Sequence, residues 1–392
     1  MRTGAAALLS VLVAGITGGS AGMPEDDRVM PRVREEALRE DALSRAQLWR
    51  EPPPARRTSL RRNPSGPHAF GSADRMSCRF HLEETSGSTN KFKCTFANGE
   101  VLKVKYRSSE VHTEVAASRL LEALGAGADH MYLVDSLRCF GCPADPDTLL
   151  RCISSPYGDL RQRCAESFGG RPTPTGDVAI TIDYSTFVDF EIVSIERRLE
   201  GESIVGDQSE GWGWDELDAA SSTRATRAER DALRLLAVLL NNWDNRRSNQ
   251  RLLCLPGALR ADGTCARPFA YMHDTGATFG WTKGEKDERK LDVEGWRQVG
   301  VWKDPAACVV RIASPPLHGA TFGEATISES GRRFLVDRLR RVPEKEIRAL
   351  FEGARFADFE GASPESRDID NWVKAFQGKV REIAERPPCP TL

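Results

Sequence analysis

The stretch LLNNWDNRRSNQRLL, residues 239–253, places Asp244 and Asn249 five residues apart at the end of an apolar segment, with Arg246 and Arg247 between them. Aspartate and asparagine are poor helix formers and charged side chains are costly to bury, so the stretch is either a solvated turn or a site. Carboxylate and amide oxygens can hold a divalent cation, a carboxylate can accept the proton of a hydroxyl, and arginines can bind phosphates. An Asp–Asn pair at a helix end is by itself usually a capped turn. The residues around it must therefore decide between the two interpretations.

A second acidic candidate, Asp274, stands in HDTGATFG, directly after the apolar end of a hairpin-like stretch. Asp-Thr-Gly-Ala after an apolar strand is also the signature of aspartic proteases, which work with two carboxylates that share a proton. The chain contains no second Asp-Thr-Gly or Asp-Ser-Gly. An aspartic-protease-like hydrolase that uses Asp274 would therefore lack half of its machinery. We expect the neighbouring His273 to pack or form a hydrogen bond rather than bind a metal or a phosphate.

Three short alternating segments, CRFHLEE, KFKCTF and EVLKVKY, come earlier in the chain. Alternation of apolar and polar residues is typical of half-buried strands, and the Asn-Gly between the last two segments is a strong hairpin signal. We expect an antiparallel three-stranded meander over residues 78–106. Lys103 and Lys105 share one face of the third strand, and Lys105 stands at its end.

The segment SEVHTEVAASRLLEALG follows at once and predicts a helix that ends at Gly125. Two further strand-like segments, HMYLVDSL and DVAITIDYSTFVDFEIVSIE, are separated by a cysteine-rich insertion at residues 138–176. From about residue 223 the pattern is mainly helical. RAERDALRLLAVLLNNW is the most apolar helix, and residues 331–351 form an amphipathic helix pair. The sequence therefore predicts an α+β protein.

In this order, the elements resemble the protein-kinase fold over roughly residues 77–281. The catalytic loop of kinases has an Asp and an Asn with four residues between them, as Asp244 and Asn249 have, and a cationic residue two positions after the Asp, where Arg246 stands here. Asp274-Thr-Gly is similar to the Asp-Phe-Gly motif of kinases. The resemblance implies a two-lobed protein-kinase-like fold, with a small antiparallel β-sheet lobe and a mainly helical lobe.

The same resemblance implies roles in the transfer of a phosphoryl group from ATP or another nucleotide. Asp244 would accept the proton of the acceptor hydroxyl, and Arg246 would bind phosphate oxygens. Asn249 and Asp274 would hold Mg²⁺ or Mn²⁺, because the reaction needs a carboxylate and an amide oxygen on the metal.

The lysine that binds the nucleotide phosphates in kinases lies on the third strand, which favours Lys105 and leaves Lys103 as the second candidate. The family's partner for this lysine is a glutamate on the following helix. We predict Glu114 for this role, because Glu110 lies too near the helix start and Glu122 lies two turns further along.

The loop TSGSTN stands where kinases have a glycine-rich loop, but it contains only Gly87. This departure points to divergent relatives, namely HipA-type kinases, phosphoinositide-kinase-like enzymes, and kinases of the four-jointed and Golgi casein-kinase type. The blocks LKVKYRSSEVHTEVAASRLLEALG, GWGWDEL, LLNNWDNRRSN and YMHDTGATFG also look like those of a group of exported bacterial proteins of unassigned function. Neither resemblance supplies the acceptor, which could be a protein, a glycan or a small molecule. The alternative is a catalytically inactive kinase-fold binding or scaffold protein, since the glycine loop is degenerate and ATP is scarce outside the bacterial cytoplasm.

Arg2 is followed by AAALLSVLVAGIT and then by GGSAG, which is the pattern of a secretory signal peptide cleaved after Gly22. This apolar run is too short for a transmembrane helix, and no later segment is long and apolar enough for one. Residues 23–76 predict a charged helix and a Pro/Arg-rich linker that is a flexible tether or a loose wrap. Residues 77–205 predict the β-rich lobe with its cysteine-rich insertion, and residues 206–392 the mainly helical lobe. We therefore expect a secreted or periplasmic protein.

Ten cysteines in an exported chain indicate disulfides rather than reactive thiols or metal ligands. Cys254 and Cys265 are the easiest pair, because their disulfide would close a hairpin. CFGC at residues 139–142 lacks the second Cys-x-x-Cys of a typical zinc site. The chain has 55 basic and 57 acidic residues and a formal net charge of −2, so its composition gives no reason to expect a nucleic-acid partner.

Overall fold

The computed structural model describes residues 9–13, 25–52, 59–85, 87, 89–155, 157–168, 171–172, 178–206, 211–219, 224–280, 291–312 and 319–390. The chain forms two compact units. The first comprises Met1–Gly22, Asn63–Val111 and Met131–Arg197, and the second comprises Met23–Arg62, His112–His130 and Arg198–Leu392. The predicted cleavage site after Gly22 lies outside the described residues.

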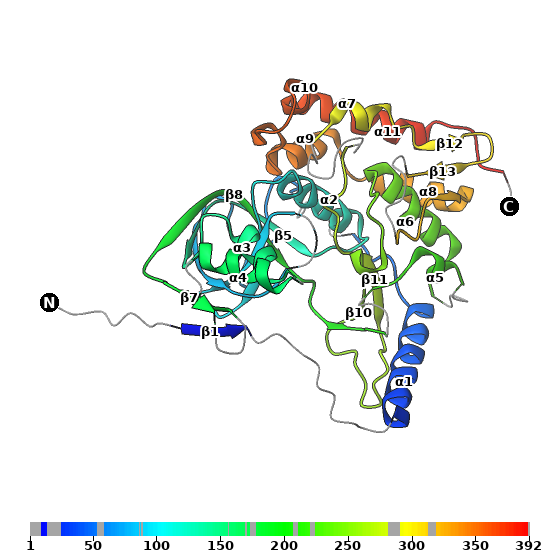
Figure 1. The fold of residues 1–392 in the computed structure, drawn as a ribbon. Coiled ribbons are helices and arrows are strands. Elements are labelled where there is room, and N and C mark those ends of the chain that lie inside the picture. Colours follow the sequence, from blue (N-terminus) through cyan, green and yellow to red (C-terminus); the bar gives the residue numbers. More distant parts are fainter. Residues whose placement is uncertain are drawn as a thin grey trace. The chain divides into compact units, whose positions relative to one another are not determined.

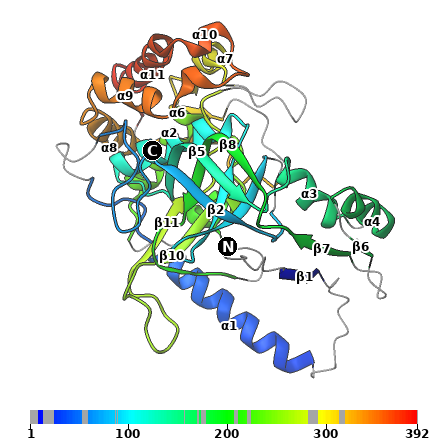
Figure 2. The same ribbon diagram turned by 90° about the vertical axis from the view of Figure 1, so that its left-hand side faces the viewer.

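A closed barrel forms the centre of the first unit, with the strands in the order β2-β3-β4-β8-β5. Figure 2 shows several of these strands side by side. The predicted meander is confirmed, because β3 pairs antiparallel with both β2 and β4. The barrel strands are β2 (Arg75–His81), β3 (Lys91–Phe96), β4 (Val101–Lys105), β5 (His130–Phe140) and β8 (Phe187–Arg197).

The alternation in these strands places aromatic rings inside the barrel. The rings of Phe92, Tyr106 and Phe190 pack against one another with centroids 5.0–5.6 Å apart. We expected a purely antiparallel sheet, but β2 pairs with β5 in parallel. A helix lies between β4 and β5 in the chain, and such a crossover lets a strand return in the same direction as an earlier one. This pair closes the barrel, so that the sheet has no free edge.

A small sheet and two helices complete the first unit. The sheet has the order β1-β7-β6 and includes β1, which belongs to the predicted signal segment. The helices occupy the cysteine-rich insertion. The bounds are β1 (Leu9–Val13), β6 (Arg171–Pro172), β7 (Val178–Ile182), α3 (Pro146–Ile153) and α4 (Gly158–Ser167).

The helix α6 (Arg227–Leu240) is the buried centre of the second unit, and α8 (Glu329–Leu339) packs along it (Figure 1). Thr226 starts α6 with a capping box, in which its hydroxyl accepts the N–H of Glu229 and the Glu229 carboxylate accepts the N–H of Thr226. The helix ends at Asn241, whose φ of 53° is left-handed. These signals fix where the loop that carries Asp244 begins.

Helices dominate the rest of the second unit, and strands contribute two small sheets, β11-β10-β9 and β12-β13-β14. The predicted hairpin is confirmed as β10 and β11. The helices are α1 (Glu25–Ser44), α2 (Glu110–Leu124, whose first two residues belong to the first unit), α5 (Trp214–Ala219), α7 (Val293–Gln298), α9 (Glu344–Gly353), α10 (Pro364–Arg367) and α11 (Ile369–Ala384). The 3-10 turns are η1 (Arg247–Asn249) and η2 (Phe356–Asp358). The strands are β9 (Glu202–Ser203), β10 (Gln250–Cys254), β11 (Pro268–Met272), β12 (Trp302–Asp304), β13 (Val309–Arg311) and β14 (Glu324–Thr326).

The segment after α1 is part of the second unit and packs on other elements of it, so its described residues are not a flexible tether, the first of our two expectations. Gln47 forms a bridge with Phe269, and the indole of Trp49 donates to the carbonyl of Glu229. Further on, Arg119 of α2 donates to the carbonyls of Leu60 and Arg61. Burial lowers the pKa of Arg119 to about 10. The apolar Trp and Leu in a charged leader were the signal for this packing.

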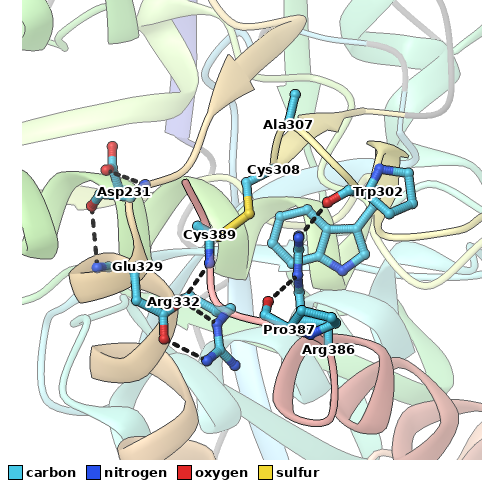
Figure 3. The surroundings of a disulfide bond; sticks show 12 residues. Asp231, Trp302, Ala307, Cys308, Glu329, Arg332, Arg386, Pro387 and Cys389 are labelled. Carbon is cyan, nitrogen blue, oxygen red and sulfur yellow. Dashed lines mark hydrogen bonds and ion pairs between the residues drawn. A yellow bond between two sulfur atoms is a disulfide. The ribbon is translucent and has the colours of Figure 1, made fainter. Parts of the chain in front are cut away.

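Five disulfides use all ten cysteines, as the composition predicted. The predicted pair Cys254–Cys265 is confirmed. The other pairs are Cys78–Cys94, Cys139–Cys142, Cys152–Cys164 and Cys308–Cys389, the last shown in Figure 3. Each pair lies within one unit. Among the described residues, none of the helices is long and apolar enough to cross a bilayer. The predicted α+β class, with a small β-rich unit, a mainly helical unit and disulfides, is confirmed.

Candidate functional site

The loop after α6 leaves the helix through two asparagines. Asn241 adopts the left-handed conformation, and its side-chain amide donates to the carbonyl of Gly280 at 2.6 Å. Phe279 donates its N–H to the carbonyl of Leu240. The last turn of α6 thus holds the segment that follows Asp274. Asn tolerates positive φ better than most residues, which explains its place at this turn.

Asn249 forms hydrogen bonds with two other predicted site residues of the second unit, Asp244 and Asp274. Its side-chain Nδ2 donates to the backbone carbonyl of Asp244 at 2.7 Å. Its own backbone carbonyl accepts the N–H groups of His273 at 2.9 Å and Asp274 at 3.2 Å. Residues 239–253 therefore do not form a solvated turn. They contain a loop that is fixed at both ends to the Asp274 segment.

The carboxylate of Asp244 forms a two-pronged ion pair with Arg246. Nε of Arg246 lies 2.6 Å from Oδ1, and Nη2 lies 2.9 Å from Oδ2. Asp244 is buried, whereas the side chain of Arg246 is 42% exposed. The guanidinium thus covers a carboxylate at the rim of the loop and can reach solvent without unfolding it. Such fork geometry suits carboxylates and phosphates equally.

Asn245, between these two residues, holds the opposite side of the loop. Its Oδ1 accepts the N–H groups of Thr321 and Phe322 at 3.1 and 2.9 Å, and its Nδ2 donates to the carbonyl of Phe322 at 2.9 Å. A cavity of 520 Å³ borders this segment. Its walls include Thr321 and Phe322, together with charged residues of α5 and α6.

Asp274 begins a turn that is tied to α2. Its Oδ1 accepts the N–H of Gly276 at 3.3 Å, and the hydroxyl of Thr113 donates to the carbonyl of Gly276 at 2.7 Å. Thr275 is fully buried. The neighbouring His273 forms hydrogen bonds with Asp129 and Arg251, so its predicted hydrogen-bonding role is confirmed.

The lysines of β4 belong to the first unit. Lys105 is the last residue of the strand, as predicted, and is fully buried, with its Nζ 3.3 Å from Oε2 of Glu110. Lys103 is partly exposed, and its Nζ lies 2.7 Å from Oε2 of Glu196. Our exclusion of Glu110 was wrong, because the first turn of α2 follows β4 so closely that its carboxylate reaches Lys105. Glu114 is buried one turn further along α2, in the second unit, and its pairing with Lys105 stays a prediction.

Sequence reasoning missed Lys91. It is the first residue of β3, lies directly opposite Lys105 in the ladder, and is also buried. Like charges placed opposite each other destabilise a sheet, so this arrangement suits a site that receives anions. The signal was present in the sequence, because a hairpin across Asn98-Gly99 puts the two lysines in register.

No family model matches the chain, and no curated protein matches it. Among solved structures, the chain is similar to a Helicobacter pylori proinflammatory kinase, CtkA, with 10% identity, 80% of this chain and 97% of that chain covered, and a TM-score of 0.43. It is also similar to the Golgi casein kinase with Mn/ADP bound, with 12% identity, 80% and 74% covered, and a TM-score of 0.31. These similarities assign no role to an individual residue, and only the contacts within this chain can support such roles.

Proposed function

We propose that the protein is a kinase-like phosphotransferase that moves a phosphoryl group from ATP or another nucleotide to a hydroxyl acceptor. The observation that carries this proposal is the bridging of Asp244 and Asp274 by Asn249. The reaction requires a base, a metal-binding amide and a metal-binding carboxylate at one place. Asp244, Asn249 and Asp274 supply these three groups, and the hydrogen bonds of Asn249 to the backbones of both aspartates support their common site.

Asp244 would orient the acceptor hydroxyl and take its proton while the new phosphorus–oxygen bond forms and the bond to the leaving nucleoside diphosphate breaks. Arg246 would release the Asp244 carboxylate and turn to the phosphate, a movement that its 42% exposure permits. The same guanidinium would then offset the charge that develops on the transferred group.

The donor set of the second unit fits Mg²⁺ or Mn²⁺. Nδ2 of Asn249 is engaged with Asp244, so Oδ1 is the atom of its amide that suits a cation. Asp274 adds a carboxylate, and both hard cations prefer oxygen ligands. A bound ion would supply charge neutralisation on the nucleotide phosphates.

Lys105 would bind nucleotide phosphates, with Glu114 as the proposed partner that positions it. Lys103 stays the second candidate. Lys91 extends this proposal, because its place opposite Lys105 adds a second buried cation on the same face of the sheet. We further propose that the protein acts outside the cytoplasm, where its five disulfides are stable.

Calorimetry with ATP and Mn²⁺ on the oxidised protein tests the proposal. We expect binding by the wild type and a loss of at least tenfold in affinity for Asp274→Asn, because an amide is a weaker metal ligand than a carboxylate. Asp244→Asn should keep the nucleotide affinity but lose transfer to water or acceptor by about 10²-fold or more, followed as release of nucleoside diphosphate. Full release of nucleoside diphosphate by Asp244→Asn would contradict the role of this residue. An aspartic-protease-like site that uses Asp274 would instead hydrolyse peptides, and Asp244→Asn would leave that hydrolysis intact.

The second candidate is a catalytically inactive binding or scaffold protein with this fold. Two observations favour it: Arg246 already occupies both oxygens of Asp244, and the loop before β3 has a single glycine. This candidate predicts no binding of nucleotide and Mn²⁺ by either the wild type or Asp274→Asn.

A further inference from the structure

A buried carboxylate, Asp129, lies in the short connection between α2 and β5. Its Oδ1 accepts the backbone N–H of Leu199 at 2.8 Å and the hydroxyl of Tyr271 at 2.7 Å. Its Oδ2 accepts a hydrogen bond from Nδ1 of His273. Only 2% of the residue is exposed. A buried charge is costly unless it is fully hydrogen-bonded, so three donors on one carboxylate mark a built structure rather than a chance contact.

The hydrogen bonds assign the state of His273. Nη2 of Arg251 lies 3.2 Å from Nε2 of His273, and arginine can only donate. Nε2 must therefore accept, which leaves the proton on Nδ1, where it is donated to Asp129. His273 thus lies with Nδ1 toward the Asp129 carboxylate and Nε2 toward the Arg251 guanidinium. The tautomer is fixed by both partners.

Asp129 is held in its ionised form. Burial alone would raise the pKa of its carboxyl group, but the interaction with His273 and the donors from Leu199 and Tyr271 outweigh that effect and lower the pKa below its usual value. Arg251 supplies the compensating positive charge on the far side of the imidazole. The row Asp129–His273–Arg251 therefore links the end of α2 to β10 and β11 through directional contacts.

This row ends at the candidate metal-binding residues. The N–H of His273 and that of Asp274 share the carbonyl of Asn249, so the contacts of the imidazole restrain a residue that is hydrogen-bonded to Asn249 and adjacent to Asp274. Asp129 and Leu199 also flank two of the points at which the chain passes between the units, after His130 and after Arg197. The Asp129 carboxylate thus holds the backbone at Leu199 and the ring of His273, the neighbour of Asp274.

We propose that Asp129, acting through His273, is a positioning residue that holds Asn249 and Asp274 in the geometry that binds the metal–nucleotide complex. This inference rests on the proposed function of those two residues. It assigns a role to Asp129, which precedes Asp274 by 145 residues in the sequence.

The hydrogen-bond donors around Asp129 and His273 determine which substitutions test this role. Asp129→Asn keeps the size of the side chain, but its amide must present an N–H either to His273 or to the Tyr271 and Leu199 donors, so one contact is lost in any orientation. His273→Leu removes both ring contacts, whereas His273→Asn can still donate to Asp129 from nearly the same place as Nδ1. We expect Asp129→Asn and His273→Leu to weaken Mn²⁺ binding about tenfold or more, in the range found for residues that orient metal ligands, and His273→Asn to recover part of the loss.

Asp231→Asn is the matched control. Asp231 is a similarly buried carboxylate of the same unit, and its Oδ2 accepts the N–H of Ser328 at 2.9 Å (Figure 3). It has no hydrogen bond to the loops of Asp244 or Asp274 among those that the structure describes. Its loss should lower the free energy of unfolding, but Mn²⁺ affinity should stay within about twofold of the wild type.

Mn²⁺ affinity in the presence of ADP, measured by electron paramagnetic resonance below the unfolding temperature of each variant, decides the question. A loss in Asp129→Asn and His273→Leu with a normal value in Asp231→Asn supports the inference. Unchanged affinity in folded Asp129→Asn or His273→Leu overturns it, even if both are less stable, and His273→Leu alone decides if Asp129→Asn does not fold. A wild type that binds no Mn²⁺ with ADP overturns the proposed function and this inference together, whereas a wild type that binds beside unaffected variants overturns only the inference.

Discussion

Lys103 and Lys105 stand two residues apart on β4 but differ sharply in environment. Lys105 is fully buried beside Glu110, and Lys103 is partly exposed beside Glu196. An ammonium group is kept out of water only where other groups compensate its charge. The buried member is therefore the better candidate for binding phosphates, and the two residues form a natural pair for comparison.

We predict that Lys105→Met weakens nucleotide binding at least tenfold, because it removes a buried cation from the proposed phosphate site. Lys103→Met should change the affinity less than about threefold, because the Lys103 ammonium group is partly exposed and already paired with Glu196. Calorimetry with ATP and Mn²⁺ measures both. The reverse order of the two losses would transfer the role to Lys103.

The sequence could indicate contacts of the candidate site where they are local and could not indicate those between distant residues. Asp244, Asn249 and Asp274 could be found because a fixed spacing and a hairpin between them are local features. The contact between Asp129 and His273 could not be found, because it joins residues 144 positions apart without a local pattern. Glu110 was excluded for its place at the helix start, although that place is what brings it to Lys105.

The helix α11 contains a buried lysine, Lys379. Lys379 is buried, donates to the carbonyl of Val299 at the end of α7, and lies 5.3 Å from the centre of the Trp296 ring. Burial lowers its pKa from 10.5 to about 8, partly opposed by Glu382. The contact fastens α11 to α7 in a region that is otherwise rich in aromatic rings.

This contact predicts a pH dependence of stability. Between pH 8 and 10.5 the unfolded chain keeps the proton of Lys379 while the folded protein has lost it, so the free energy of unfolding should rise with pH in this window. The difference corresponds to roughly 3 kcal/mol at most. Urea unfolding of the wild type and Lys379→Met at several pH values measures it, and Met should remove this rise. If the free energy of unfolding changes with pH in the same way in both proteins, Lys379 does not contribute to the pH dependence.

Helices and strands could be predicted where a single hydrophobic period runs through the segment and clear signals mark its ends. The capping box of α6, the turn at Asn98-Gly99 and the glycine after α2 all belong to this class. At Gly125 a φ of +83° and the carbonyl of Arg50, 2.3 Å from where a Cβ would stand, require glycine. The parallel pairing of β2 with β5 was missed, because a hydrophobic pattern fixes the faces of a strand but not its neighbour.

At the scale of the whole molecule, each disulfide stabilises one unit, but the pairs enclose loops of very different length. Cys308–Cys389 spans 81 residues and holds the C-terminal segment (Figure 3), whereas Cys139–Cys142 spans three. Around the first pair, Glu329 accepts the N–H of Cys389 and pairs with Arg332, and this hydrogen bond to Arg332 is the main cause that lowers the pKa of Glu329 to about 2. The C-terminal segment is thus held by polar contacts as well as by the covalent bond.

A disulfide restricts the unfolded chain more strongly when its loop is longer. Replacing both Cys308 and Cys389 with Ala should therefore lower the free energy of unfolding of the second unit by about 4 kcal/mol, and the same change at Cys139 and Cys142 should cost the first unit about 1.5 kcal/mol. The half-cystines of both pairs are buried, so the loss of packing is similar and the contrast isolates loop length. Denaturant unfolding, with hydrogen exchange to assign each transition to its unit, measures the two costs. Equal losses would mean that the polar contacts of Glu329 hold the C-terminal segment and that loop closure contributes little.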